Sequence, residues 1–309
     1  MIRLRGYVLG RFRVLADDRP IDGFKTRKSR SLLGFLMLNA GRSYAREVLV
    51  AKVWGEDRAG DTLKALRQEL WTIRTAFRDA GVAAEDILTL GGDEVTFTVP
   101  PEFWLDAREF AKAMESLPAD TEIPVDADQA AGLEAAMALY DDDLLPGIYD
   151  DWCLFPREAL RDRFISGLEM LLFRHQGRAS WDAAVACAKR LLDADPLLEH
   201  VHRDLMRTYF AKGNRPAALR QFEQCKRLLQ RELGIEPMAE TVELYRAIRE
   251  EHSISVDRGA HPESAELLQR TRIPSPPTGD AIAELRALKR DLRTADRRID
   301  QVIHEIAGR

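Results

Sequence analysis

One stretch in the first third of the chain, residues 61–78, carries the side chains best suited to recognition chemistry. Its leucines, isoleucine and phenylalanine recur three and four residues apart, which predicts a helix with one buried face. Only one acidic residue, Glu69, lies between Leu63 and Arg78, whereas a solvated helix face normally mixes charges of both signs. The predicted outer face is rich in cations and hydrogen-bonding groups: Lys64, Arg67, Gln68, Trp71, Arg74, Thr75 and Arg78.

These residue types in this arrangement point to reading of a nucleic-acid duplex. An arginine can donate two hydrogen bonds to O6 and N7 of guanine, and a glutamine can pair with adenine in the same way. The other cations can neutralise phosphates and release the counterions that surround them. We therefore predict a recognition helix that enters a groove of double-stranded DNA. The alternative is a solvated helix face without a ligand.

A second basic cluster lies at the start of the preceding helical pattern and comprises Lys25, Arg27, Lys28 and Arg30. Cations at this position are expected to contact the DNA backbone, although a loose surface cluster is the alternative. The overall charge supports the first interpretation. Residues 1–78 hold 17 Lys and Arg against 8 Asp and Glu, while the whole chain holds 46 against 51. A basic N-terminal part on an acidic body is typical of a nucleic-acid-binding module joined to another domain.

The elements around this helix follow a recognisable order. Alternating apolar residues predict strands within residues 2–14, and a Gly-Gly turn at 91–92 predicts a hairpin of 87–90 with 95–99. Between them, apolar periodicity and Gly signals predict helices over 26–38, 45–54 and 61–77, the last with Asp61 as its N-cap. Strands, three helices and a hairpin form a winged helix. The tip of the hairpin is acidic, so we do not expect it to enter a minor groove.

Everything from residue 104 onward is predicted to be helical. Gly and Pro signals separate segments near 106–116, 126–140, 156–177, 180–193, 198–212, 215–233 and 238–251. Two of these repeat with a period of 34 residues, because Trp181–Ala184 aligns with Arg215–Ala218. Small and aromatic residues at these intervals predict tetratricopeptide-like helix pairs.

The end of the chain changes composition twice. Residues 253–279 are rich in Ser, Pro and Gly, which predicts a linker. Residues 280–307 are predicted to form a coiled-coil helix that makes a homo-oligomer, most simply a dimer; the rival interpretation is that it folds back on the repeat domain. Its apolar seam comprises Leu285, Leu288, Leu292, Ala295, Ile299, Val302 and Ile306. The predicted fold is mainly α: a winged helix over 1–103, an all-α repeat domain over 104–252, the linker, and this helix.

Other residues argue against an enzyme. His200 and His202 are two positions apart and point to different sides of a helix, so a metal site is not expected. Asp141–Asp143 fits a helix end better than a cation site. The three cysteines form no close pair, and no phosphate-binding glycine motif occurs. We expect no cofactor and no metal. Without a secretory signal or an apolar span, the protein is expected in the cytoplasm.

Two blocks of sequence resemble a known family. The run FKTRKSRSLLGFLMLNAGRSYAREVLVAKVWGE followed by LKALRQELWTIRTAF is similar to the winged helix of SARP-type regulators. The segments ALYDDDLLPGIYDDW and RDLMRTYFAKGNRPAALRQFEQCKRLLQRELGIEP resemble the bacterial transcriptional activator domain that follows it. The resemblance covers about residues 1–250. It implies binding to repeated promoter sites and recruitment of RNA polymerase, with groove-reading positions at Arg67, Gln68, Trp71 and Arg74.

The sequence thus favours a transcriptional activator that binds DNA. A repeat-type scaffold, whose winged helix docks protein instead of DNA, is the alternative. A small-molecule effector on the repeat domain is conceivable from this fold, but no residue pattern identifies one.

Overall fold

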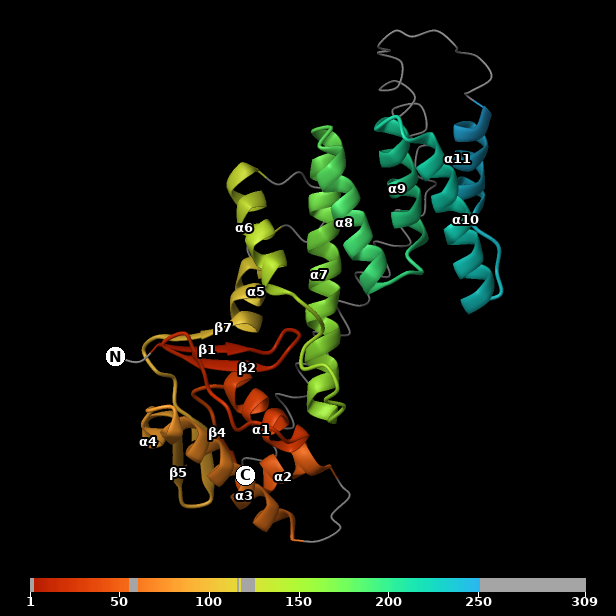
Figure 1. The fold of residues 1–309 in the computed structure, drawn as a ribbon. Helices are drawn as coiled ribbons and strands as arrows, with labels where there is room; N and C mark the ends of the chain where they lie inside the picture. Colours follow the sequence, from red (N-terminus) through yellow and green to blue (C-terminus); the bar gives the residue numbers. More distant parts are fainter. Residues whose placement is uncertain (1–2, 56–60, 116, 118–125, 251–309) are drawn as a thin grey trace, which may run out of the picture.

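The computed structural model describes residues 3–55, 61–115, 117 and 126–250 of the 309-residue chain. The predicted seam from Leu285 to Ile306 and the predicted linker therefore lie outside the described residues. Within them, an N-terminal region of small sheets and helices continues into an all-helical region (Figure 1).

The N-terminal region contains two small sheets. One has the strand order β3-β2-β1-β7, in which β1 pairs antiparallel with β2 and parallel with β7. The other has the order β4-β6-β5 and contains the predicted hairpin as β5 and β6. The strands are β1 (Leu4–Tyr7), β2 (Arg13–Ala16), β3 (Arg19–Pro20), β4 (Ser43–Ala45), β5 (Leu88–Gly91), β6 (Glu94–Phe97) and β7 (Phe103–Leu105).

Four helices belong to the same region: α1 (Arg27–Leu38), α2 (Arg46–Trp54), α3 (Thr62–Asp79) and the single turn α4 (Ala84–Ile87). The predicted N-cap of α3 is confirmed, because the Asp61 side chain accepts from the backbone N–H of Lys64. At the start of α1, the Thr26 side chain accepts from the backbone N–H of Ser29. The strands β3, β4 and β7 and helix α4 were not predicted, since segments of two to four residues carry too little periodicity to be recognised.

The remaining helices run consecutively to residue 250 (Figure 1): α5 (Asp106–Glu115), α6 (Ala127–Leu139), α7 (Asp151–Gly177), α8 (Trp181–Ala194), α9 (Glu199–Ala211), α10 (Arg215–Glu232) and α11 (Ala239–Glu250). Neighbouring helices in the sequence pack against one another from α7 to α11. Ala184 and Ala218, the paired positions of the 34-residue repeat, are both fully buried at these helix crossings. The small residues of the repeat thus lie in the core between neighbouring helices.

Helix α7 begins five residues earlier than the sequence indicated. The sequence predicted this helical segment near 156–177, and proline lacks the N–H that a helix interior needs. The helix nevertheless starts at Asp151 and includes Pro156 in its second turn. Burial of Trp152 and Cys153 against the rest of the core holds this first turn in place.

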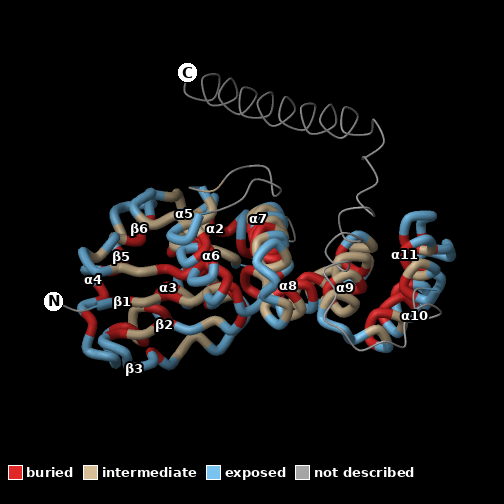
Figure 2. Tube along the Cα trace, turned by 90° about the horizontal axis from the view of Figure 1, so that it is seen from above, coloured by how far each residue is buried: buried red, intermediate tan, exposed pale blue. Residues whose placement is uncertain are grey.

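The two regions share one hydrophobic core, which extends from Leu4 in β1 to Leu205 in α9 (Figure 2). The segment between α6 and α7 lies directly on the winged helix, where Leu145 N–H donates to the carbonyl oxygen of Val8 at 2.8 Å. Leu145 also packs on α1 so closely that a Cβ added to Gly34 would lie 2.7 Å from its side chain. The predicted domain limit at residues 103 and 104 falls within β7, which pairs with β1.

Arg157 of α7 fixes this crossing segment from the other side. Its guanidinium is buried and donates to the backbone carbonyl oxygens of Leu144 at 2.8 Å, Leu145 at 2.9 Å and Ile148 at 2.6 Å. One side chain thus donates to three backbone carbonyl oxygens in the core, of which that of Leu145 also accepts from the Ile148 N–H at 3.1 Å.

Asp150 connects the crossing segment to α1. Its carboxylate, 8% exposed, accepts from the Ser31 hydroxyl and lies 3.5 Å from Lys28 Nζ and 3.6 Å from an Arg27 nitrogen. Trp152 Nε1 donates to the same Ser31 hydroxyl at 3.2 Å. The carboxylate is thus both a hydrogen-bond acceptor and the counter-charge for two cations at the junction.

Replacing this carboxylate should loosen the junction. We expect Asp150→Ala to lower the free energy of unfolding by about 2 kcal/mol, because a hydrogen bond to a charged group is lost and Lys28 stays partly buried without its counter-charge. Asp151→Ala is the matched control and should cost less than about 1 kcal/mol, since its exposed carboxylate only favours the start of α7. Urea unfolding measures both, and equal costs would contradict the assignment.

Asp106, the first residue of α5, is a second buried carboxylate between the regions. It accepts from the backbone N–H groups of Val8 at 2.9 Å, Leu9 at 3.0 Å and Ala107 at 2.7 Å. Burial raises the pKa of Asp106 to about 6, because its effect is larger than that of these hydrogen bonds, which lower the pKa.

The raised pKa gives a pH dependence of defined sign. The folded protein holds the Asp106 proton more tightly than the unfolded chain, so this residue adds stability below its folded pKa and loses that contribution as pH rises through about 6. Relative to the wild type, Asp106→Asn should therefore be more destabilising near pH 5 than near pH 7.5, by about 1.4 kcal/mol. Urea unfolding of both proteins at the two pH values measures it, and a pH-independent cost would contradict it.

Candidate nucleic-acid interface

Helix α3 has one side buried in the core and one side facing solvent, as the sequence predicted. Leu66, Leu70, Ile73 and Phe77 are all at most 3% exposed and face the core, where α3 packs against α1 and α2. Because these residues lie three and four apart, the residues between them are forced to the opposite side of the helix. The prediction of a helix with one buried leucine side is confirmed.

The outer side of α3 has an open stretch in its first half. Lys64, Arg67 and Gln68 are exposed, and the Trp71 side chain is 61% exposed. Neither Lys64 nor Arg67 forms an ion pair with any residue that the structure describes. We call these four residues the open face of α3. It offers two free cations, one amide and one aromatic ring to a ligand.

The second half of the same side is occupied within the protein. Arg74 and Arg78 both pair with Glu85 of α4, at 2.7 Å and 3.4 Å. A hydrogen bond from its own backbone, and then that from Arg74, hold the pKa of Glu85 below its usual range. Arg74 also has a buried Nε without a hydrogen-bond partner. Thr75 is only partly exposed.

The basic cluster before α1 is likewise split. Lys25 and Arg30 are exposed, and Arg30 Nε donates to the Thr26 carbonyl oxygen at 3.4 Å. Arg27 pairs with Asp150 but keeps 49% of its side chain exposed. Lys28 is the most enclosed, because it also donates to the Val53 carbonyl oxygen and lies over the Trp54 ring. Lys28, one of the four predicted phosphate contacts, is therefore already occupied by contacts within the protein.

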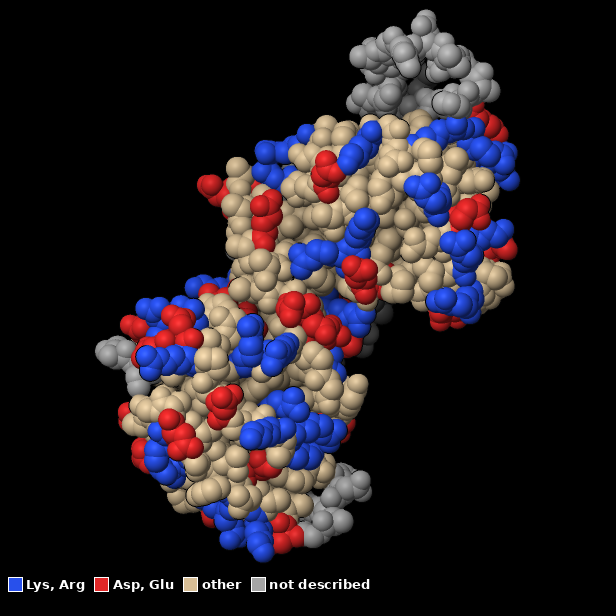
Figure 3. All heavy atoms as spheres, viewed as in Figure 1, with Lys and Arg blue, Asp and Glu red and all other residues tan. Residues whose placement is uncertain are grey.

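On the surface, Lys and Arg side chains gather over α1 and α2 and at the lower end of α3 (Figure 3). Exposed cations of this region in the described residues are Lys25, Arg27, Arg30, Lys52, Lys64 and Arg67. Lys52 of α2 was not singled out from the sequence, because one lysine on an amphipathic helix gives no local signal. The hairpin tip carries the exposed acids Asp93 and Glu94, as the sequence indicated.

Two carboxylates that shape this surface were also missed. Glu85 follows α3 after the turn at Gly81, and Asp150 is more than a hundred residues away from the cations it contacts. A pattern on one helix cannot reveal a partner that a turn or a different domain supplies.

His200 and His202 have partners within the fold. His202 is buried, with Nε2 3.0 Å from the Pro196 carbonyl oxygen, and His200 Nε2 lies 2.9 Å from Glu169. In the described part of the chain, no group of three metal-binding side chains comes together. Among those residues no helix is both long and apolar enough to span a membrane.

Both regions of the chain match models of known protein families. Residues 23–93 match the model of the C-terminal domain of transcriptional regulatory proteins, which contains the winged helix, and residues 105–249 match the bacterial transcriptional activator domain. The chain belongs to the SARP-type transcriptional regulators. Its two matched regions stand in the order that the sequence predicted.

Relatives of this SARP-type chain carry regulatory names. It is 27% identical over 246 residues to the regulatory protein AfsR of Streptomyces coelicolor, a match that covers 79% of this chain and 24% of AfsR. It is 25% identical over 237 residues to the transcriptional regulatory protein MoaR1 of Mycobacterium tuberculosis, covering 72% of each. The chain thus spans about a quarter of AfsR and most of MoaR1.

A solved structure shares the fold of this SARP-type regulator. Mycobacterium tuberculosis EmbR, determined in complex with a low-affinity phosphopeptide, superimposes with a TM-score of 0.58 at 19% identity. The match covers 83% of this chain and 67% of the EmbR chain.

The ion pairs of Glu85 give a test of this surface. We expect Glu85→Gln to strengthen DNA binding about two- to fivefold, because Arg74 and Arg78 lose the carboxylate that competes with phosphates. Asp86→Asn is the matched control: it removes the same charge from an exposed neighbour without a described ion pair. Fluorescence anisotropy with a labelled duplex measures the affinities. Equal effects of the two variants would show that only net charge matters.

Proposed function

We propose that this protein is a cytoplasmic transcriptional activator, not an enzyme, and that the open face of α3 reads bases in the major groove of its promoter. The observation that carries the proposal is the exposure of Arg67 and Gln68 side by side on the outer side of α3, with neither cation of that face paired inside the described protein. These are the two side-chain types that recognise guanine and adenine by paired hydrogen bonds.

The surrounding cations fit contacts to the DNA backbone. Lys25, Arg27 and Arg30 lie at the start of α1, and Thr26 Oγ1 donates to Glu69 of α3 at 3.1 Å, which fixes that start beside the reading helix. Lys64 can neutralise a further phosphate at the first turn of α3. Arg74, Arg78 and Thr75 would contribute after Glu85 gives way to phosphate.

The family supports the remaining parts of the proposal. The region from α5 to α11 corresponds to a bacterial transcriptional activator domain, so we propose that it contacts RNA polymerase once the winged helix is bound. We further propose that the protein acts as a homo-oligomer on repeated sites, with the seam from Leu285 to Ile306 as the contact. Comparing the mass of residues 1–279 with that of the full chain by light scattering tests the seam, because identical masses would exclude it.

The first test concerns base reading. Arg67→Ala should weaken binding to the promoter site by about 1–3 kcal/mol and relax sequence preference there, while thermal unfolding stays unchanged. Arg163→Ala, an exposed cation of α7 without a described ion pair, is the matched control and should leave affinity unchanged. Quantitative gel shifts on genomic fragments, followed by a salt series, measure both effects.

The salt series separates DNA binding from protein docking. A DNA-binding winged helix loses affinity steeply with salt, in proportion to the phosphates that it contacts. If no shift occurs with any genomic fragment, or if Arg67→Ala binds as the wild type does, the assignment of α3 as the reading helix is wrong.

A further inference from the structure

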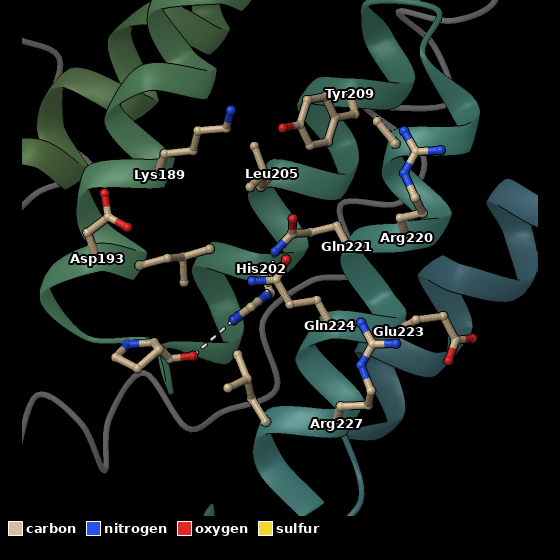
Figure 4. A pocket seen from close by; sticks show the side chains of 14 residues that line it. Lys189, Asp193, His202, Leu205, Tyr209, Arg220, Gln221, Glu223, Gln224 and Arg227 are labelled. Atoms are coloured by element: carbon tan, nitrogen blue, oxygen red, sulfur yellow. Dashed lines mark hydrogen bonds between the residues drawn. The ribbon is translucent and has the colours of Figure 1, made fainter. Parts of the chain in front are cut away.

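A groove on the helical region lies apart from the DNA-binding surface. Helices α8, α9 and α10 enclose a volume of about 730 Å³ (Figure 4). Its floor is apolar, formed by residues such as Leu192, Pro196 and Leu205, and its rim is polar and charged. This size and this mixture are typical of a ligand site.

One polar side chain is fixed at the centre of the groove. Gln221 is 7% exposed, and its Nε2 lies 2.7 Å from His202 Nδ1. His202 Nε2 lies 3.0 Å from the Pro196 carbonyl oxygen, which only accepts, so the proton sits on Nε2 and Nδ1 accepts from Gln221. The amide oxygen of Gln221 is therefore the end left for a ligand, and it points toward Leu205 and the open groove (Figure 4).

This arrangement makes Gln221 a preset acceptor. Burial lowers the pKa of His202, which keeps the imidazole neutral and able to hold the amide in one orientation. An acceptor held in an enclosed position suits a single N–H donor, such as the backbone amide of a peptide.

The walls supply three cations that form no described ion pair. Lys189 on α8 and Arg220 and Arg227 on α10 are exposed, and none forms an ion pair with a described residue. Arg220 and Arg227 are seven residues apart on one helix, which separates them by about 10 Å along the groove. Two carboxylates three residues apart on a polyproline II chain lie on the same side and about 9 Å apart, because that extended helix has three residues per turn and rises about 3.1 Å per residue.

The groove also contains two acids, and their positions give it direction. The Glu223 carboxylate points away from the His202–Gln221 pair (Figure 4). Asp193 stands on the α8 wall, one helical turn from Lys189, so that wall is neutral on balance. The positive side of the groove is the α10 wall, and the acidic side of a ligand would lie along it.

We propose that this groove binds an extended acidic segment of a partner protein, with a backbone N–H on Gln221 and two carboxylates on Arg220 and Arg227. The apolar floor takes the side chains that lie between the two carboxylates. The proposal does not depend on DNA binding, because the groove and α3 share no residue.

The test uses the full chain and a labelled synthetic peptide that carries two glutamates three residues apart with leucines between and after them. We expect saturable binding by fluorescence anisotropy, and a loss of about tenfold in affinity for the Arg220→Gln/Arg227→Gln variant. Arg231→Gln, one turn beyond the groove on α10, is the matched control and should bind as the wild type does. Unchanged thermal unfolding and DNA affinity would show that the variants are folded.

Peptide controls address the spacing. A peptide with both glutamates replaced by glutamine should bind about tenfold more weakly, because it lacks the charges that pair with the arginines. A peptide with the glutamates adjacent should also bind about tenfold more weakly, because its two carboxylates cannot reach both arginines. If all three peptides bind alike, or if Arg220→Gln/Arg227→Gln binds as the wild type does, the groove does not recognise an acidic segment.

One further variant identifies the source of the ligand. This chain itself contains Glu263 and Glu266 at the same spacing. Glu263→Gln/Glu266→Gln in the full chain should leave peptide affinity unchanged if the ligand belongs to a partner. A rise of several-fold would mean that the chain's own segment competes for the groove and would overturn the assignment to a partner.

Discussion

The structure depends on the burial of one side of α3. Four large apolar side chains of this helix enter the core against α1 and α2, and each contributes about 1.5–3 kcal/mol relative to exposure. The spacing of those four residues fixes how α3 is rotated about its axis. The outward positions are therefore occupied by Lys64, Arg67, Gln68 and Trp71. The hydrophobic effect thus sets the direction of polar groups that it does not itself stabilise, and the proposed DNA contact follows from that direction.

The second constraint is the junction between the two regions. Two buried carboxylates, Asp106 and Asp150, and one buried guanidinium, Arg157, satisfy backbone and side-chain groups where the chain crosses from one region to the other. Hydrogen bonds to charged groups in a core lose much free energy when one partner is removed. The shared core and these bonds make the winged helix and the helices behind it one structural unit.

Glu85 and Gln221 illustrate two opposite uses of a polar group. Glu85 forms ion pairs with Arg74 and Arg78, so under the proposed function phosphates would have to displace it from this part of the basic surface. Gln221 is held by His202 with its oxygen still available, so that the groove presents an acceptor already oriented for a ligand. In the first case an internal bond competes with the ligand, and in the second an internal bond prepares for it.

The sequence alone determined the order of the longer helices and of the β5–β6 hairpin, the N-cap at Asp61, and the face that α3 presents, because helical periodicity and capping are local properties of neighbouring residues. It also indicated the family, through residues close together in the chain. Only the tertiary structure decided which cations are free: Lys28 is bound by Asp150, and Arg74 and Arg78 by Glu85, while Arg67 is open. These ion pairs join residues that are separated in the sequence by a turn or by a whole domain. Such pairs produce no periodic pattern of residues from which they could be predicted.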